Sequence, residues 1–289
     1  MLYVTKGGQL LNIVRAEKAG FCFGVERAIE LAEKTSASGN TVSLGPLIHN
    51  QQVVDYLKEK GIKVADSLEE VKKGQQLVIR SHGVPPFIYN EARDKGINIV
   101  DATCPFVQKA QKLAAKSSKD NFVIVVGDGD HPEIKGILGW AGKNSRAVET
   151  LEEAKQLPHY SSLAVLAQTT QAKNNFLKIV EELKSHTDNL VVHNTICNAT
   201  SERQDSARKV AKEVSVMLVV GGRNSSNTRK LGTICSEETK TYLIETADEL
   251  QQNWFDDVEN VGLTAGASTP DWIIEEVFIK CQKLLKMKI

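Results

Sequence analysis

Apolar and polar residues alternate in blocks along this chain, and the blocks recur in a fixed order. Short apolar runs typical of buried strands, such as FVIVV at 122–126 and VSVMLVV at 214–220, are followed by polar or glycine-rich loops. A stretch with the apolar spacing of a helix comes next, as in HPEIKGILGWAG after the first of these runs. Strands that alternate with helices in this way predict an α/β fold with parallel sheets and right-handed crossovers.

The block order occurs three times. Each repeat carries one cysteine at the start of a helix, and the three are Cys22, Cys104 and Cys197. His49 follows the first of these cysteines by 27 residues, His131 follows the second by 27, and Asn224 follows the third by 27. Chance rarely reproduces such an order three times. We therefore predict three α/β lobes related by a pseudo-threefold axis, each presenting one thiol.

The repeats also predict the domain boundaries. We expect an N-terminal extension at 1–12, a first lobe at 13–99, a second at 100–192, and a third at 193–289 that ends with the C-terminal helix. Every polar loop follows a strand, and ligand sites of parallel sheets lie beyond the carboxyl ends of the strands. We therefore expect the polar loops of the three lobes to face one centre.

Composition narrows the class of protein. The chain has 289 residues, with 36 basic and 36 acidic side chains, so no net charge attracts it to nucleic acid or to a membrane. It contains no apolar run of the length that a membrane span needs. Its first residues lack the basic and apolar segments of a signal peptide. Five widely spaced cysteines argue against a disulfide framework, and we expect a cytoplasmic protein.

Three thiols at equivalent positions are a set of soft ligands that suits an iron–sulfur cluster or zinc. A four-iron cluster needs four ligands, so three cysteines would leave one iron open to a small molecule. The partial positive charge at a helix start also favours the thiolate. Three buried structural cysteines are the alternative, and the repeated position argues against it. Cys235 and Cys281 break the pattern in apolar contexts, so we predict that they belong to the core.

The polar loops contain donors suited to an anion. They are the side chains of His49, His82, His131, Ser225, Ser226, Asn227 and Ser268. Imidazoles, hydroxyls, an amide and the N–H groups of a helix start together make a cradle for phosphate or diphosphate. Taken alone, Ser225, Ser226 and Asn227 are better explained as a plain helix cap, and the alternative for each histidine is an ordinary loop residue. The expected convergence of the loops favours the anion site.

Two further residues have groups that can handle protons. Glu133 lies in the HPE sequence and is placed to carry protons, although an acidic residue also suits the first turn of a helix. Thr169 is placed to position a water or a substrate hydroxyl, or to cap the next helix. Asp128 and Asp130 have the pattern of turn residues. The glycine loops are not the dinucleotide fingerprint, so we expect no nicotinamide site.

These segments together resemble a known family. The motifs are AGFCFGVERAI, LGPLIHN, RSHGVPP, DATCP, HPE, QTT, CNAT with the following Arg203-Gln204, GGRNSSNT and TAGAST. From about Val14 to the C-terminus, the sequence is similar to the 4-hydroxy-3-methylbut-2-enyl diphosphate reductases, the IspH/LytB family. The resemblance implies a reductase that uses two electrons and two protons to remove an allylic hydroxyl as water, in the last step of the non-mevalonate isoprenoid pathway.

The resemblance also implies the site. The fold would be three α/β lobes around one [4Fe–4S] cluster per chain, held by Cys22, Cys104 and Cys197 with one iron open. The matching diphosphate-binding residues are His49, His82, Ser225, Asn227 and Ser268, with His131 and Ser226 lining the same pocket. Glu133 matches the proton donor and Thr169 its hydroxyl partner, and His131 is counted with them as catalytic. The electron donor would be a ferredoxin or a flavodoxin.

Two other functions fit parts of the pattern. A zinc-dependent hydrolase acting on a phosphorylated metabolite would use the same three thiols with water as the fourth ligand. A non-enzymatic module that binds a phosphorylated metabolite would need the cysteines only as structural residues. Metal analysis separates the first from an iron–sulfur reductase. Ligand binding that persists after every cysteine is replaced would indicate the second.

Overall fold

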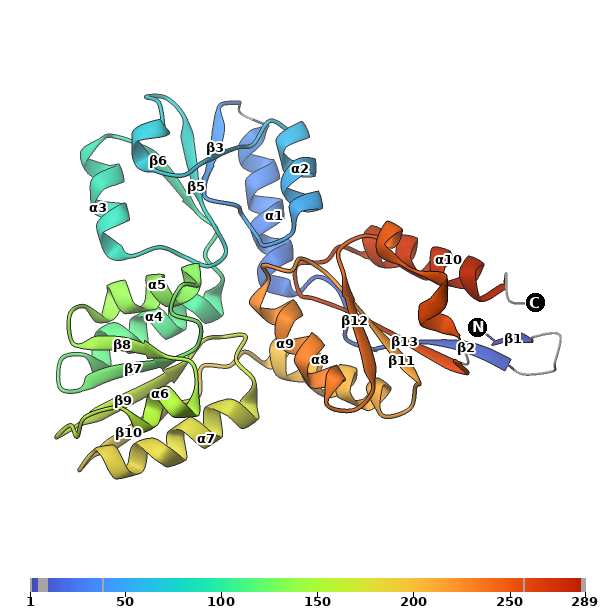
Figure 1. Cartoon of the computed structure of the whole chain (residues 1–289). Coiled ribbons are helices and arrows are strands. Elements are labelled where there is room, and N and C mark those ends of the chain that lie inside the picture. Colours follow the sequence, from blue (N-terminus) through green and yellow to red (C-terminus); the bar gives the residue numbers. More distant parts are fainter. Residues whose placement is uncertain (1, 5–9, 38, 257, 287–289) are drawn as a thin grey trace. The chain divides into compact units, whose positions relative to one another are not determined.

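Strands and helices alternate along the whole chain and build three sheets. The computed structural model describes residues 2–4, 10–37, 39–256 and 258–286 (Figure 1). The chain divides into two compact units. The first unit comprises Met1–Cys22, His49–Gln51 and Asn198–Ile289, and the second comprises Phe23–Ile48 and Gln52–Cys197. No helix in the described ranges has an apolar stretch of the length that a membrane span requires.

The second unit contains two sheets of parallel strands. In one of them the order is β4-β3-β5-β6. The strands are β3 (Thr41–Leu44), β4 (Lys63–Ala65), β5 (Gln76–Ile79) and β6 (Asn98–Asp101). The accompanying helices are α1 (Phe23–Ser36), α2 (Gln51–Glu59), the short η1 (Leu68–Glu70) and α3 (Pro86–Asp94). Leu77 and Ile79 of β5 are buried in one cluster with Ala92 of α3, which fixes that helix on the sheet.

The other sheet of the second unit has the order β10-β9-β7-β8. Its strands are β7 (Phe122–Val126), β8 (Ser145–Val148), β9 (Leu163–Ala167) and β10 (Leu190–His193). Its helices are α4 (Pro105–Ser117), α5 (Pro132–Ala141), α6 (Leu151–Lys155), α7 (Lys173–Leu183) and η2 (Lys184–His186). Ile124 and Val126 pack with α6 and α7, whereas Val123 and Val125 pack with α4 and α5. Strand side chains alternate between the faces of a sheet, so an unbroken apolar run is covered by helices on both sides.

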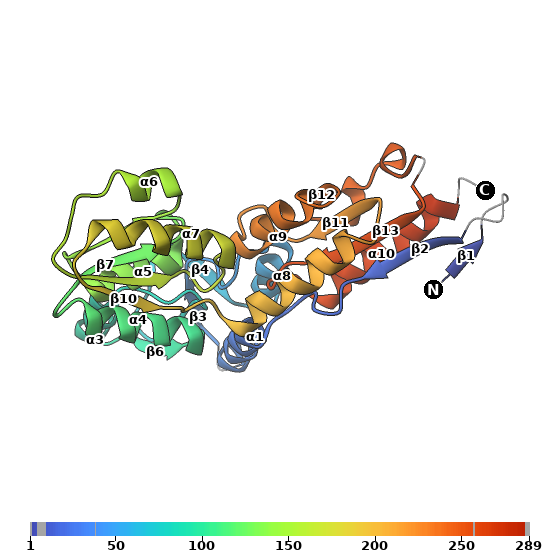
Figure 2. The same ribbon diagram turned by 90° about the horizontal axis from the view of Figure 1, so that it is seen from below.

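The first unit contains the third sheet, with the order β1-β2-β13-β11-β12. Its strands are β1 (Leu2–Val4), β2 (Leu10–Arg15), β11 (Val216–Val220), β12 (Lys240–Ile244) and β13 (Asn260–Ala265). Its helices are α8 (Asn198–Ala211), α9 (Ser226–Ser236), η3 (Ala247–Glu249), η4 (Gln252–Phe255) and α10 (Asp271–Lys286). Only β1, paired with β2, is antiparallel to its neighbour among these described strands. Figure 2 shows α10 running beside β2, and α10 also contacts β11.

The three sheets share one strand order. In each sheet the second strand of the lobe lies at one edge, followed by the first strand and then the third. The fourth position is taken by the strand that leads into a cysteine, which is β6, β10 or β2. In the third sheet that strand is β2, from the start of the chain, which pairs in parallel with β13 and leads into Cys22. The prediction of three α/β lobes with parallel sheets is confirmed.

The position of β2 differs from the boundaries drawn on the sequence. Those boundaries divided residues 10–15 between an N-terminal extension and the first lobe, whereas the strand belongs to the third sheet. The physical reason is that the first cysteine needs its own preceding strand, and the last sheet has no fourth strand of its own. Residues 1 and 5–9 of the predicted extension lie outside the described residues.

Candidate functional site

The same backbone hydrogen bond fixes each of the three repeated cysteines. The N–H of the cysteine donates to a carbonyl in the loop that follows a neighbouring strand. That strand is β13 for Cys22, β5 for Cys104 and β9 for Cys197, and each pairs in parallel with the strand that leads into the cysteine. The pairs are Cys22 with Ala267 at 3.3 Å, Cys104 with Ser81 at 3.0 Å, and Cys197 with Thr169 at 3.1 Å. Each of these cysteines is half-buried and directly precedes a helix or caps it. The thiol and the polar loop of a lobe are therefore held together.

Cys235 and Cys281 have a different environment. Both are buried in apolar clusters of the first unit, and burial raises the pKa of each thiol to about 12. They therefore stay protonated at neutral pH and are poor ligands for a metal. None of the five cysteines, all of which lie in the described residues, is in a disulfide. The prediction that Cys235 and Cys281 are core residues is confirmed.

Arg203 of α8 supports the backbone that leads into Cys22. Its Nε and Nη2 donate to the carbonyl of Gly20 at 3.1 and 2.9 Å, and Nη2 also donates to the carbonyl of Phe21 at 2.7 Å. The side chain is buried, and its Nη1 donates to the carbonyl of Ala199 in α8. A planar fork of donors can hold two adjacent carbonyls at once. The sequence shows Arg203 within a motif, but the spacing gives no sign of this role.

In the second unit, a buried carboxylate lies beside the loop that anchors Cys197. Glu133 is 2% exposed, and Thr169 is 5% exposed. Thr169 N–H donates to Glu133 Oε1 at 2.6 Å, and Thr169 Oγ1 donates to Oε2 at 2.8 Å. Both carboxylate oxygens thus accept hydrogen bonds, an arrangement that suits the ionised form. The Thr169 carbonyl also accepts a hydrogen bond from the N–H of Cys197. Thr169 therefore joins the Glu133 carboxylate to the backbone of a repeated cysteine.

Two histidines complete this polar group of the second unit. His131 caps α5, and its Nδ1 accepts a hydrogen bond from the N–H of Glu133 at 3.1 Å. The neutral ring therefore carries its proton on Nε2. The rings of His82 and His131 meet edge to face, with centroids 5.2 Å apart. His82 follows Ser81, whose carbonyl anchors Cys104. A chain of contacts therefore joins Cys104, through the histidines, the carboxylate and Thr169, to Cys197.

In the first unit, the start of α9 has the features of an anion site. Ser225 caps the helix, and its Oγ accepts from the N–H of Thr228 at 3.4 Å. Ser225, Ser226 and Asn227 are all buried. Within the described residues, the amide oxygen and the amide nitrogen of Asn227 both lack a hydrogen-bond partner. Buried polar groups are rarely left unsatisfied, so Asn227 is a candidate for contact with a ligand.

Close packing of glycines brings the neighbouring loops to this helix start. A Cβ on Gly221 would lie 2.6 Å from Thr269 Oγ1, and one on Gly266 would lie 2.1 Å from Thr228 Oγ1. A Cβ on Gly222 would lie 2.5 Å from the carbonyl oxygen of His49. That same carbonyl accepts a hydrogen bond from Ser268 Oγ at 3.2 Å. Only glycine at these positions lets the loops containing His49, Ser225 and Ser268 approach so closely.

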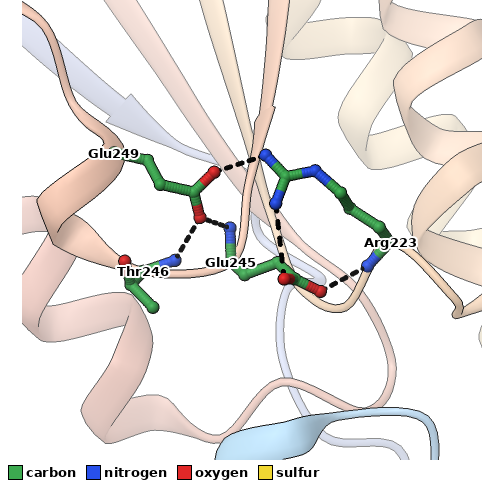
Figure 3. A network of polar contacts seen from close by, with 4 residues as sticks. All are labelled: Arg223, Glu245, Thr246 and Glu249. Atoms are coloured by element: carbon green, nitrogen blue, oxygen red, sulfur yellow. Dashed lines mark hydrogen bonds and ion pairs between the residues drawn. The ribbon is translucent and has the colours of Figure 1, made fainter.

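A network of charged groups fastens the loop that precedes Ser225 (Figure 3). The N–H of Arg223 donates to Glu245 Oε1 at 2.7 Å, and its guanidinium bonds to Glu245 and to Glu249. Glu249 Oε1 in turn accepts from the N–H groups of Glu245 and Thr246 at 2.7 and 3.0 Å. Burial acts to raise the pKa of Glu249, but the hydrogen bonds from Arg223 and from the two N–H groups outweigh it and lower that pKa. The loop is thus tied to the end of β12.

The predicted site residues fall into two sets. The second unit brings together Cys104, Cys197, His82, His131, Glu133 and Thr169. The first unit contains Cys22, His49, Ser225, Ser226, Asn227 and Ser268. Asp128 accepts from the N–H of Asp130 at 3.0 Å, as expected of a turn. No role is predicted from the sequence for Arg203, Arg223 or Thr228, and the partners of the two arginines are distant in the chain.

Replacing Arg203 with alanine should destabilise the segment before Cys22. The carbonyls of Gly20 and Phe21 would lose charge-assisted hydrogen bonds, and we expect the free energy of unfolding to fall by about 1.5–3 kcal/mol. Arg208→Ala on the same helix is the control, since its ion pairs with Glu237 and Glu238 are at the surface and should contribute below about 1 kcal/mol. Denaturant unfolding measures both. Equal losses in the two variants would contradict the role of Arg203.

The Glu249 network should make stability depend on pH. A carboxyl whose pKa is lowered by folding stabilises the protein above the unfolded value, here 4.5, and that contribution is lost as pH falls through the folded pKa. We expect Glu249→Gln to be less stable than the wild type above pH about 5, by on the order of 1 kcal/mol, and the difference to close at lower pH. Urea unfolding across this range is the measurement. The exposed Glu275→Gln on α10 should show no such trend.

The sequence matches the family described as LytB protein over residues 13–282. The 4-hydroxy-3-methylbut-2-enyl diphosphate reductase of Geobacter sulfurreducens is 47% identical over 276 residues, which cover 94% of this chain and 98% of that protein. The enzyme of the same name from Aquifex aeolicus is 45% identical, over 95% of this chain and 97% of that protein.

Solved structures agree with these relatives. The structure of (E)-4-hydroxy-3-methyl-but-2-enyl diphosphate reductase, the terminal enzyme of the non-mevalonate pathway, is 45% identical with a TM-score of 0.68, covering 94% of this chain and 99% of that one. The structure of the E-1-hydroxy-2-methyl-but-2-enyl-4-diphosphate reductase from Plasmodium falciparum is 28% identical with a TM-score of 0.88, covering 94% of this chain and 87% of that one. This chain therefore belongs to the LytB family.

Proposed function

We propose that this chain is a 4-hydroxy-3-methylbut-2-enyl diphosphate reductase. The reaction removes the allylic hydroxyl as water, consumes two electrons and two protons, and yields isopentenyl and dimethylallyl diphosphates. The observation that carries the proposal is the Glu133–Thr169 pair, a buried carboxylate and hydroxyl bonded to the loop that anchors Cys197. A carboxylate that can carry a proton, joined through Thr169 to the backbone of a repeated cysteine, suits a reductive dehydration.

We propose that Cys22, Cys104 and Cys197 hold a [4Fe–4S] cluster, one per chain, with one iron left open. The donor set fits this group, because the three thiols are half-buried at helix starts, whereas Cys235 and Cys281 are buried and protonated. Helix N-termini favour thiolates and an anionic group. When bound, the cluster would supply electrons and a Lewis-acidic iron for the leaving oxygen.

The diphosphate is assigned to the polar loops. Asn227 offers a buried donor and acceptor that have no partner in the described part of the chain, and Ser225, Ser226 and Ser268 supply hydroxyls. The first N–H groups of α9 add donors and the positive end of the helix. His49, His82 and His131 supply imidazole donors. This chemistry suits a dianionic or trianionic group and orients the allylic end of the substrate.

Proton delivery is assigned to Glu133 and Thr169. The 2.8 Å hydrogen bond between Thr169 Oγ1 and Glu133 Oε2 gives a path along which a proton can move. The neighbouring N–H of Thr169 holds the carboxylate in place from the other side at 2.6 Å. His131 orients Glu133 through the bond from its N–H and presents its own Nε2 proton. Burial of the pair keeps bulk water from competing for the proton.

The electrons must come from another redox molecule. The two glycine loops of the chain lack the dinucleotide fingerprint, which argues against a bound nicotinamide cofactor. We propose a one-electron carrier protein, either a ferredoxin or a flavodoxin, as the donor. We also assign the reaction to the cytoplasm, since the cysteines form no disulfide and a reducing compartment keeps thiols available for ligation.

Protein purified without exposure to air should contain about four irons and four sulfides per chain. Cys104→Ser should lose most of this iron and its visible absorbance, because one of three ligands is gone. Cys281→Ala is the matched control and should keep its iron, since that thiol is buried in the core. Zinc without sulfide in the wild type would instead indicate the hydrolase. Substrate binding that survives loss of all three repeated cysteines, with no redox activity, would indicate the binding module.

Glu133→Gln should bind the allylic diphosphate but turn it over slowly. Glutamine can still pair with Thr169, so the fold of the loop is kept while the proton-transferring group is lost. We expect a fall in kcat on the order of 10²–10⁴-fold, with the substrate dissociation constant changed only a few-fold. Steady-state rates with a chemical reductant and calorimetric binding measure the two quantities. Glu153→Gln, an exposed carboxylate of α6, should match the wild type, and unchanged turnover in Glu133→Gln would refute the role.

A further inference from the structure

Three helices of the chain start at a repeated cysteine, and they differ in the charge that they expose. On α1, the first exposed charged side chains after Cys22 are Glu26 and Glu30. On α8, after Cys197, they are Glu202 and Asp205. On α4, after Cys104, they form a basic set. The three helices have the same place in the repeat, so this difference is specific to the lobe that carries Cys104.

The basic set lies along one face of α4. Lys109, Lys112 and Lys116 are all exposed, and their spacing of three and four residues places them in line on a helix. The row starts about 7 Å and ends about 18 Å along the helix axis from Cys104. The helix has no acidic residue, and no ion pair within the described residues involves these lysines. Like charges in a row repel one another, so this face has a positive potential that an acidic partner would relieve.

An aromatic hollow adjoins this row. It has a volume of about 530 Å³ and lies between α3, α4 and α5 of the second unit. Tyr89 and Trp140 line it, with ring centroids 6.3 Å apart, and Lys112, Arg93 and Asp101 add two cations and one carboxylate to the lining. Trp140 is held by a hydrogen bond from Nε1 to the carbonyl of Val84 at 3.1 Å. Fixed aromatic residues and arginine beside a charged border are typical of protein–protein interfaces.

A second apolar contact lies at the cysteine end of the helix. Phe106, two residues after Cys104, is 40% exposed. It gives a docked protein an apolar contact close to the thiol, while the lysines lie farther along α4. Electron-transfer complexes are small and transient, commonly burying less than about 1,200 Å². A helix face of this length, with one hollow and one exposed phenyl ring, is of that scale.

We propose that this face of α4, from Phe106 to Lys116 with the adjoining hollow, is the docking surface for an acidic electron-carrier protein. The inference rests on the proposed reductase function, which needs an outside donor. In each cycle two reduced carriers each give up one electron and leave oxidised, and with two protons the hydroxyl departs as water. The positive row attracts the acidic carrier and sets its orientation, and Cys104 is the repeated thiol beside which it docks.

The test uses an acidic flavodoxin with its flavin, and the enzyme loaded with its cluster. The variant is Lys109→Glu, Lys112→Glu and Lys116→Glu in one chain. Calorimetry at low ionic strength should show binding weakened on the order of 10–100-fold, with the loss shrinking as salt is added. Flavodoxin-driven turnover should fall by a similar factor. Turnover driven by reduced methyl viologen, a small donor that needs no docking face, should stay within about twofold of the wild type.

A matched control separates this surface from a general effect of charge. Lys155→Glu, Lys173→Glu and Lys178→Glu reverse three exposed lysines on α6 and α7 of the same unit, away from the cysteine-led helix. This variant should bind flavodoxin as the wild type does. Should the first variant be unstable, the neutral triple Lys109→Gln, Lys112→Gln and Lys116→Gln gives the same comparison, with a smaller loss expected. Circular dichroism checks the fold of each.

The outcomes distinguish failure of the docking surface from failure of the proposed function. Unchanged flavodoxin binding in the α4 variant, or an equal loss in the control, overturns the docking surface. Wild-type binding to transfer RNA or to anionic vesicles through these lysines, with none to flavodoxin, overturns it as well. Absence of viologen-driven turnover in the wild type counts against the reductase itself, while the binding measurement still tests the surface.

Discussion

The rest of the site depends on one constraint, the hydrogen bond from the N–H of each repeated cysteine to the loop after a neighbouring strand, which is β13, β5 or β9. It occurs three times, at 3.0–3.3 Å, with Ser81, Thr169 and Ala267 as acceptors. Because the acceptor directly precedes or belongs to the polar loop, placing the thiol also places His82, Thr169 and Ser268. The repeated cysteines and the side chains proposed to bind substrate are therefore held together by the same backbone contact.

The same constraint explains how the N-terminus is used. Each repeated cysteine follows a strand of a sheet, and β2, between β1 and β13, is this strand for Cys22 in the third sheet. The connection after β2 is then secured by Arg203, which binds the carbonyls of Gly20 and Phe21. The sheet formed by the last third of the chain is thus extended by β2, and the beginning and end of the sequence fold as one unit.

The three repeats differ in the roles proposed for their side chains and in the charge that they expose. The features proposed to bind the diphosphate concentrate at the start of α9, where Asn227 is buried with its amide unsatisfied, and Glu133, the proposed proton donor, is in the lobe of β7 and β9. The exposed positive row belongs to that same lobe, on the helix that starts at Cys104. A chain with no net charge thus presents a local row of exposed lysines on α4, whereas acidic side chains occupy the matching places on α1 and α8.

The sequence by itself determined the α/β class, the three parallel sheets, the repeated cysteines and the core position of Cys235 and Cys281. Periodicity and spacing are local properties, and three copies reinforce one another. Only the tertiary structure decided which sheet β2 joins, that Thr169 holds both oxygens of Glu133, that Arg203 supports Cys22, and that Arg223 fastens the anion loop. These contacts join residues far apart in the chain, and no spacing within one sequence encodes such a pairing.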